Sequence, residues 1–322
     1  MSGPTAPAEV KPAAAARQGR TLGVRSRRRI SLSFKVLIAV LTAVYALIPV
    51  FFVITASLNP LQTISGASLI PTRVTFDHYA RLFNSPFHPW PQWILNSVIV
   101  SSLTAIIVVA LCALAAYSFS RFRFRGRRLG LMALVLVQLF PNMLAFVALF
   151  LLLQAIGNAL PSFSVAIPGV GTFEPARLGL NSLGGLILIY AGGALGFNTW
   201  LMKAYFDTVP YDLDESALVD GASHTQAFRY VVLPLVRPVL AVIAILSFIS
   251  TYSDFILARV MLSSTENFTL AVGMTLFIRG QFTQQWGTFA AAAVIGALPI
   301  VITFLLLQRQ LIGGLARGGV KG

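Results

Sequence analysis

The chain has 322 residues, of which 57% are hydrophobic and only 11% are charged. Soluble domains carry about 25% charged residues, so the composition excludes an ordinary soluble enzyme and indicates an integral membrane protein. The one cysteine, Cys112, excludes an intramolecular disulfide and a cysteine metal cluster. The net charge of +14 would suit a nucleic-acid partner. The distribution of the basic residues along the chain has to show whether they serve nucleic-acid binding or membrane topology.

The predicted fold is all-α, with six transmembrane helices over residues 34–312. A helix needs about 20 apolar residues to cross the hydrocarbon, and the first apolar run is too long for a cleaved signal peptide. Residues 1–33 are basic and poor in apolar groups, which predicts a disordered tail that anchors topology or contacts anionic lipid. Residues 313–322 form a short second tail. The expected spans are residues 34–56, 94–119, 129–153, 183–204, 239–262 and 289–311.

The basic residues are unevenly distributed among the connecting segments. The N-terminal segment, the tail after the sixth span and the loops after the second and fourth spans hold 19 of the 24 Lys and Arg residues. The positive-inside rule then predicts that both termini face the cytoplasm. Because topology explains the net charge, we expect no nucleic-acid partner.

Several catalytic signatures are missing from the sequence. No Lys stands in the Gly-Lys-Ser/Thr context of a phosphate-binding loop, so the chain is not expected to hydrolyse ATP by that route. The three histidines form no metal-binding pair. We therefore expect no catalytic residue, no metal and no cofactor on this chain.

The loop of residues 205–235, between the fourth and fifth spans, is acidic in a compartment where basic residues normally collect. Asp212 is predicted to be an N-cap, with Glu215 completing a capping box. Gly221 suits the left-handed residue that ends such a helix. Ser223 and Gln226 predict a second capping box. The pattern indicates a helix, a glycine corner and a second helix.

The same loop resembles the signature EAA-x3-G-x9-I-x-LP of permease subunits of ATP-binding-cassette (ABC) importers. The matching residues are 215–217, Gly221, Val231 and Leu233-Pro234, with Ser216 and Val231 as mild departures. The chain also resembles the smaller permease subunits of maltose/maltodextrin importers, at residues 268–274, 286–293, 297–299 and 318–322.

The resemblance implies a type I ABC importer permease in a prokaryotic cytoplasmic (inner) membrane. It also implies four kinds of partner: a second permease, two cytoplasmic ATPase subunits that bind ATP and Mg, an extracytoplasmic sugar-binding protein, and membrane lipid. In this family the glycine-turned loop is the coupling helix, which docks on an ATPase subunit. The coupling residues that it implies here are Asp212, Glu215, Ser216, Ala217, Asp220, Gly221, Ala222, Leu233 and Pro234.

The outward loop between the fifth and sixth spans has a polar tip around an aromatic ring. In the maltose-type permeases the corresponding loop enters the sugar site of the binding protein. Amides suit sugar hydroxyls, and an aromatic face suits a sugar's C–H face. A plain surface loop is the alternative. The tip residues are Gln281, Phe282, Thr283, Gln284 and Gln285.

Three features inside the spans allow two interpretations each. Gly192 and Gly196, four residues apart, favour close helix packing or a lining of the transport path. Asp254 needs a partner or access to water. It would lie either at the membrane–water interface or in a gating contact. Pro141 interrupts the third span, as a functional kink or a tolerated one.

Other functions remain as alternatives to a maltose/maltodextrin importer. An ion- or proton-coupled secondary transporter would be expected to carry buried ionisable residues and paired broken helices, and only Asp254 is a candidate. An ABC permease for another sugar, such as trehalose, is the other alternative.

Overall fold

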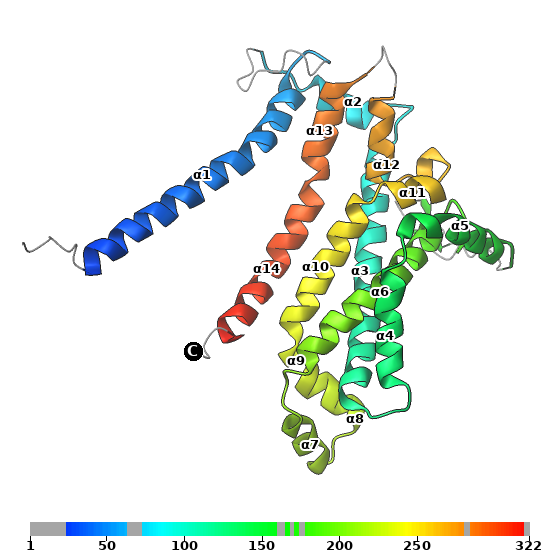
Figure 1. Ribbon diagram of the computed structural model, residues 1–322. Helices are drawn as coiled ribbons and strands as arrows, with labels where there is room; N and C mark the ends of the chain where they lie inside the picture. Colours follow the sequence, from blue (N-terminus) through cyan, green and yellow to red (C-terminus); the bar gives the residue numbers. More distant parts are fainter. Residues whose placement is uncertain are drawn as a thin grey trace, which may run out of the picture. The chain divides into compact units, whose positions relative to one another are not determined.

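The computed structural model describes residues 24–62, 73–159, 165–167, 171–173, 178–279 and 284–318. By its internal contacts the chain divides into two units, Met1–Phe51 and Phe52–Gly322. Nearly all elements are helices (Figure 1). In chain order they are α1 Val24–Leu58, α2 Asp77–Asn84, α3 Trp90–Arg121, α4 Arg127–Gln138, α5 Asn142–Ala159, β1 Val165–Ile167, β2 Gly171–Phe173, α6 Leu183–Phe206, α7 Asp212–Val219, α8 His224–Gln226, a π-helical segment Ala227–Val232, α9 Leu233–Leu235, α10 Arg237–Ser253, α11 Ile256–Met261, a 3-10 turn Thr265–Asn267, α12 Leu270–Met274, a 3-10 turn Thr275–Phe277, α13 Trp286–Gly296 and α14 Leu298–Gly318.

Within the described residues, four helices are long and apolar enough to cross a membrane, or up to six if each of two bent pairs counts as one span. The four are Leu32–Leu58, Trp90–Arg121, Leu183–Phe206 and Trp286–Gln310. Helix α1 begins at Val24, well before residue 34, and α14 runs on to Gly318. Arg and Leu are good helix formers, which accounts for these longer ends. The rest of the expected N-terminal tail, residues 1–23, lies outside the described residues.

Two of the expected spans are each divided into two helices. The third becomes α4 and α5, bent by 104° across residues 139–141. Pro141 disfavours helical backbone in the residue before it and has no N–H to continue the ladder. The expected span 239–262 becomes α10 and α11, which are separated at Asp254, where the backbone is extended.

One oxygen of Asp254, Oδ1, has three hydrogen-bond partners at that second break. Its Oδ1 accepts the amide N–H groups of Leu257 (3.1 Å) and Ala258 (3.2 Å), which are free donors in the first turn of α11. The Tyr190 hydroxyl of α6 donates to the same oxygen at 2.7 Å. The carboxylate therefore has the partner that an acid in an apolar run needs.

The only strands in the described residues are β1 and β2, in the connection between α5 and α6. They form an antiparallel pair in which Val165 faces Phe173. These strands are three residues each, so the fold remains a helical membrane fold.

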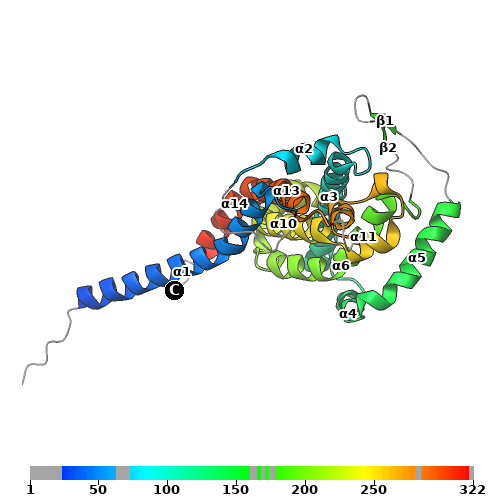
Figure 2. The same ribbon diagram turned by 90° about the horizontal axis from the view of Figure 1, so that it is seen from above.

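Helix α3 is the central element of the second unit, because it packs along both α6 and α10 (Figures 1 and 2). One buried apolar cluster surrounds Trp93 and a second surrounds Cys112. Polar groups fix one end of α3 to the segment before α12. The Trp93 indole N–H donates to the Thr265 carbonyl at 2.8 Å, and the Asn96 amide donates to the carbonyls of Glu266 and Phe268.

Gly196 allows α4 to lie directly against α6. A Cβ at this position would meet the Leu134 carbonyl oxygen at 2.5 Å, whereas a Cβ at Gly192 would meet nothing within 4 Å. Small residues permit such close backbone approach between membrane helices. The packing interpretation therefore holds for Gly196 and not for Gly192.

We predict that Gly196→Val destabilises the protein by about 1–3 kcal/mol, because added methyl groups must push α4 away from α6. Gly192→Val is the matched control on the same helix and should have little effect. Thermal unfolding of the detergent-solubilised protein measures both. Equal melting temperatures for the two variants would contradict the close α4–α6 contact.

Candidate functional site

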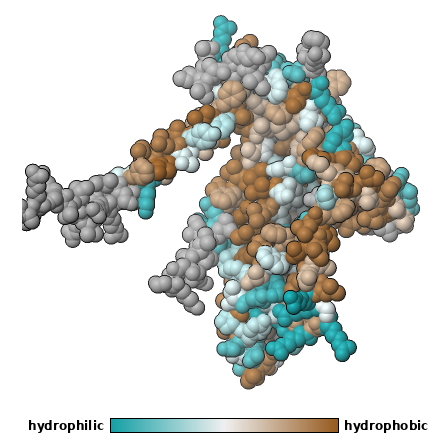
Figure 3. Space-filling model, in the orientation of Figure 1, coloured by the Kyte–Doolittle hydropathy of each residue, from teal (hydrophilic) through white to brown (hydrophobic). Residues whose placement is uncertain are grey.

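Helix α7 and the segment from α8 to α9 form the polar connection between the long helices α6 and α10. Figure 1 places α7 and α8 together at one end of the second unit, and Figure 3 shows hydrophilic surface gathered at that end. The first helix packs on the π-helical segment Ala227–Val232. The helix, corner and second helix expected from the sequence are therefore present.

Gly221 forms the corner as predicted. Its φ is +89°, a left-handed conformation. The Gly221 amide donates to the Leu218 carbonyl at 3.1 Å, and the Ala222 amide donates to the Ala217 carbonyl at 3.0 Å. This pair of bonds is a Schellman motif, which satisfies carbonyls at the end of α7.

The capping box expected at Asp212 and Glu215 is wrong. Tyr211 occupies the N-cap position, and no side chain caps the helix. Since the Tyr211 backbone is already helical and its carbonyl accepts the amides of Asp214 and Glu215, Asp212 falls inside the first turn. There the acidic side chains still favour the helix by facing the positive end of its dipole.

The second capping box is confirmed. The Ser223 hydroxyl accepts the Gln226 amide N–H at 3.3 Å, and the Gln226 side chain accepts the Ser223 amide N–H at 2.7 Å. The second helix ends at Leu235, because α9 includes Leu233 and Pro234 in its last turn. The chain then bends by 76° into α10.

The residues expected to take part in coupling present a mixed surface. Val219 is 87% exposed beside the acidic side chains, an unusual place for a large apolar group. Such a surface suits a protein partner. The exposed members are Asp212, Glu215, Ser216, Asp220 and Gly221, and the half-buried ones are Ala217, Ala222, Leu233 and Pro234.

A buried ion pair joins α7 to the end of α3. Arg121 Nε donates to Asp214 Oδ2 at 2.8 Å, and the two side chains are only 5% and 10% exposed. The Tyr117 hydroxyl, one turn back on α3, donates to Asp214 Oδ1 at 3.3 Å. We call Arg121, Asp214 and Tyr117 the α3–α7 anchor.

The same guanidinium also fixes the chain that leads from α6 into α7. Its Nη2 donates to the Val209 carbonyl at 3.0 Å and its Nη1 to the Phe206 carbonyl at 3.4 Å. The guanidinium plane lies over the Tyr211 ring, 4.4 Å from its centroid. A planar side chain with five donors is well suited to hold several groups at once.

A second set of contacts ties α3 to α6 and α7. Ser120 Oγ donates to Asp207 Oδ1 at 2.7 Å, and Lys203 forms an ion pair with the same aspartate. The Tyr211 hydroxyl donates to the Ser120 carbonyl at 2.8 Å. The start of α7 is therefore tied to the end of α3.

The sequence alone does not identify the anchor. In the sequence Arg121 is one of several basic residues in its loop, and Asp214 is one of several acids. One local signal was available: Tyr117 and Arg121 are four residues apart and share a helix face, but their common partner is 93 residues away from Arg121.

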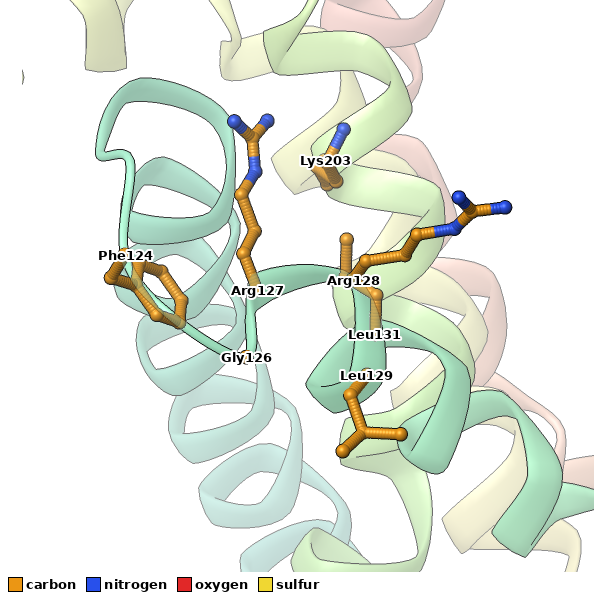
Figure 4. Close-up of a pocket in the computed structure, with 7 residues that line it drawn as sticks. All are labelled: Phe124, Gly126, Arg127, Arg128, Leu129, Leu131 and Lys203. Atoms are coloured by element: carbon orange, nitrogen blue, oxygen red, sulfur yellow. The ribbon is translucent and has the colours of Figure 1, made fainter.

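A shallow basic groove of about 620 Å³ lies beside these contacts (Figure 4). Arg127, Arg128 and Lys203 surround it, with Phe124 and Leu129 among its apolar walls. Arg127 donates to the Ser120 carbonyl at 3.4 Å. The groove thus combines two arginines from the start of α4 with one lysine of α6.

The outward loop is described only in part. Gln281, Phe282 and Thr283 lie outside the described residues. Gln284 is exposed and accepts the indole N–H of Trp286 at 2.8 Å. The Gln285 amide donates to the Phe277 carbonyl at 2.8 Å, which closes the base of the loop.

A bundle of apolar helices interrupted by a polar helix-corner-helix is the arrangement expected of an ABC importer permease, and comparison with known proteins shows this class. The family described as "Binding-protein-dependent transport system inner membrane component" matches residues 109–315. The chain belongs to this family. It is a transport subunit and not an enzyme, and it acts in a membrane importer that has other permease, ATPase and binding-protein components.

Two similar relatives differ in the sugar that they are named for. The chain is 38% identical to the maltose/maltodextrin permease MalG of Escherichia coli K12, covering 92% of this chain and 97% of MalG. It is 37% identical to the galactooligosaccharide permease GanQ of Bacillus subtilis, covering 93% and 99%.

A solved structure has the same fold. It is a bacterial ABC transporter involved in import of the acidic polysaccharide alginate, with a TM-score of 0.70 and 22% identity, covering 90% of this chain and 99% of that chain. This likeness concerns the fold alone, which is a type I importer permease.

We predict that Arg121→Ala loosens α7, because removing one partner of a buried pair leaves the other charge uncompensated, at a cost of about 3–5 kcal/mol. Amide hydrogen exchange over Asp212–Val219 should become faster. Arg128→Ala, which removes an exposed charge, is the control and should leave exchange unchanged. Unaltered exchange in Arg121→Ala would show that α7 does not depend on the anchor.

Proposed function

We propose that this chain is a permease subunit of an ATP-driven importer of maltose and maltodextrins. The observation that carries the sugar assignment is 38–41% identity to MalG proteins of several bacteria over most of both chains. Galactooligosaccharides are the second candidate, because GanQ is matched at 37% over almost its whole length.

The proposed assembly contains this chain, a second permease, two ATPase subunits and an extracytoplasmic sugar-binding protein. ATP and Mg bind to the ATPase subunits, and this chain binds no cofactor. The two permeases enclose the translocation path and change between inward-open and outward-open states. Family membership supports this composition, since an importer permease needs an energy source and a substrate donor.

Coupling is proposed to pass through α7. Its exposed acidic residues and Val219 dock on an ATPase subunit, and the α3–α7 anchor carries the displacement to α3. Because α3 packs along both α6 and α10, motion of one short helix reaches the centre of the bundle. The Gly221 corner sets the direction in which α7 is presented.

We predict that Gly221→Val uncouples ATPase docking from transport. A side chain at Gly221 has open space around it, so the cost comes from a φ of +89°, which a β-branched residue adopts at about 1–3 kcal/mol. Gly221→Asn is the matched control, since Asn tolerates this conformation. Retention of ATPase subunits and sugar uptake are measured in membranes; normal values for Gly221→Val would contradict the coupling role.

The sugar assignment is tested with the complete importer in proteoliposomes. We expect maltose- or maltotriose-loaded binding protein to stimulate ATP hydrolysis and sugar uptake, whereas galactooligosaccharides should not. Stimulation by galactooligosaccharides alone would replace the first assignment by the second. The empty binding protein provides the baseline.

The proposed orientation places both termini in the cytoplasm and the loop before α13 outside, where its tip enters the binding protein. The positive-inside distribution supports this arrangement. The opposite ends of the molecule would then meet the ATPase subunits and the binding protein.

Thiol labelling tests this orientation, with little background because the one native cysteine, Cys112, is buried. A cysteine at Gln284 should react with an impermeant reagent added outside, and the binding protein should protect it. A cysteine at Ser2 should not react from outside. The reverse pattern would refute the orientation. Labelling at Gln284 that is the same with and without the binding protein would refute the contact between the loop and the binding protein.

A further inference from the structure

A partly enclosed cavity of about 480 Å³ lies among α4, α5, α6, α10 and the start of α11. Figure 2 shows α4 and α5 at the periphery of the bundle, with α6 and α11 between them and α10. The cavity includes residues beside both breaks, Gln138 before the α4–α5 break and Asp254 at the α10–α11 break. Its volume falls within the range of about 300–1,000 Å³ for small-molecule sites.

One wall holds hydroxyl groups on α10. Ser247 Oγ is buried and has no hydrogen-bond partner among the described residues, and Ser247 is 6% exposed. Leaving a buried hydroxyl unpaired is unfavourable, so a polar ligand at this position would be stabilised. Ser250 and Thr251, on the same helix, also line the cavity.

Helices α4 and α6 contribute amide groups with one spare acceptor each to the lining. The Asn198 amide N–H donates to the Ala194 carbonyl at 2.9 Å, and that of Gln138 donates to the Gly193 carbonyl at 2.8 Å. Their side-chain oxygens take no hydrogen bond from the described residues. Both therefore keep an acceptor for the hydroxyl of a ligand.

The remaining lining supplies an acid and aromatic rings. Asp254 uses Oδ1 for Tyr190 and the α11 amides, while its Oδ2 accepts no bond from the described residues. Phe197 and Phe146 lie in the lining and offer faces to C–H groups. Among the residues that the structure describes, the lining contains no Lys, Arg or His.

We propose that this cavity is a saccharide-binding site contributed by this chain to the translocation path, and that it selects neutral oligosaccharides. This inference rests on the proposed function as a sugar importer. Ser247, Asn198 and Asp254 would pair with ring hydroxyls while Phe197 packs on the C–H face. The lone carboxylate, with no cation beside it, would repel the carboxylates of an acidic saccharide, because like charges in a weakly solvated site are strongly unfavourable.

Blocking the cavity is the first test. Gly193 lines it, and an added Cβ there meets nothing within 4 Å, so Gly193→Phe can place its ring in the cavity without a backbone clash. Gly192→Phe is the matched control, since Gly192 is equally open and lies outside the lining. We expect uptake of the trisaccharide that the wild-type importer transports, radiolabelled maltotriose under the first sugar assignment or galactotriose under the second, to fall at least tenfold in Gly193→Phe only.

Direct binding is the second test and does not depend on a bulky substitution. Equilibrium binding of the labelled trisaccharides is measured on the solubilised importer without its binding protein. Asn198→Ala and Ser247→Ala should each raise the Kd about threefold to tenfold, as expected for one lost hydrogen bond. Thr104→Val, which removes a buried unpartnered hydroxyl outside the lining, should leave the Kd unchanged. A trimer of uronic acids should not compete.

The possible failures are distinguishable. A wild-type importer that transports neither trisaccharide overturns the sugar assignment itself. A wild-type importer that transports one of them, while Gly193→Phe transports at the full rate or the alanine variants bind with unchanged Kd, overturns the site. Loss of the second permease from Gly193→Phe, together with unchanged Kd in the alanine variants, identifies the cavity as a packing surface and overturns the proposal as well.

Discussion

The buried pair of Arg121 and Asp214 is the constraint on which the functional end of this protein depends. At 5% and 10% exposure, neither charge is well solvated, so each must find its partners inside the protein. Arg121 meets this requirement by joining α3, the end of α6 and the start of α7. Helix α7 is too short to be stable alone, and the anchor gives it a fixed place against a long helix.

The breaks in the apolar helices give the interior its polar character. At residues 139–141 and at Asp254 the helical ladder stops, and the freed amides of α11 are satisfied by the Asp254 carboxylate. A membrane protein tolerates irregular backbone where it lines a cavity or is covered by protein. Both breaks adjoin the cavity among α4, α6 and α10, and the Tyr190 hydroxyl connects the second break to α6.

The proposed coupling contacts and the proposed saccharide site thus share α6. Its last turns contact the anchor through the Phe206 carbonyl, whereas Gly193 and Asn198 line the cavity. Gly196 brings the same helix against α4. A displacement at α7 therefore has a short packed route to the cavity, through rigid helices and not through a flexible loop.

The sequence by itself determined the membrane class, four of the spans, the glycine corner at Gly221 and the capping box at Ser223, because these depend on local composition, propensity and turn chemistry. It misplaced the start of α7 by one residue, since the competing contacts of Tyr211 and Asp214 with α3 are not local. Only the tertiary structure decided that Arg121 is an anchor, that Gly196 is a packing position, and that Ser247 and Asn198 face one cavity. Each of these roles requires a partner from a distant part of the chain, and hydrophobic periodicity carries no information about which distant residues will meet.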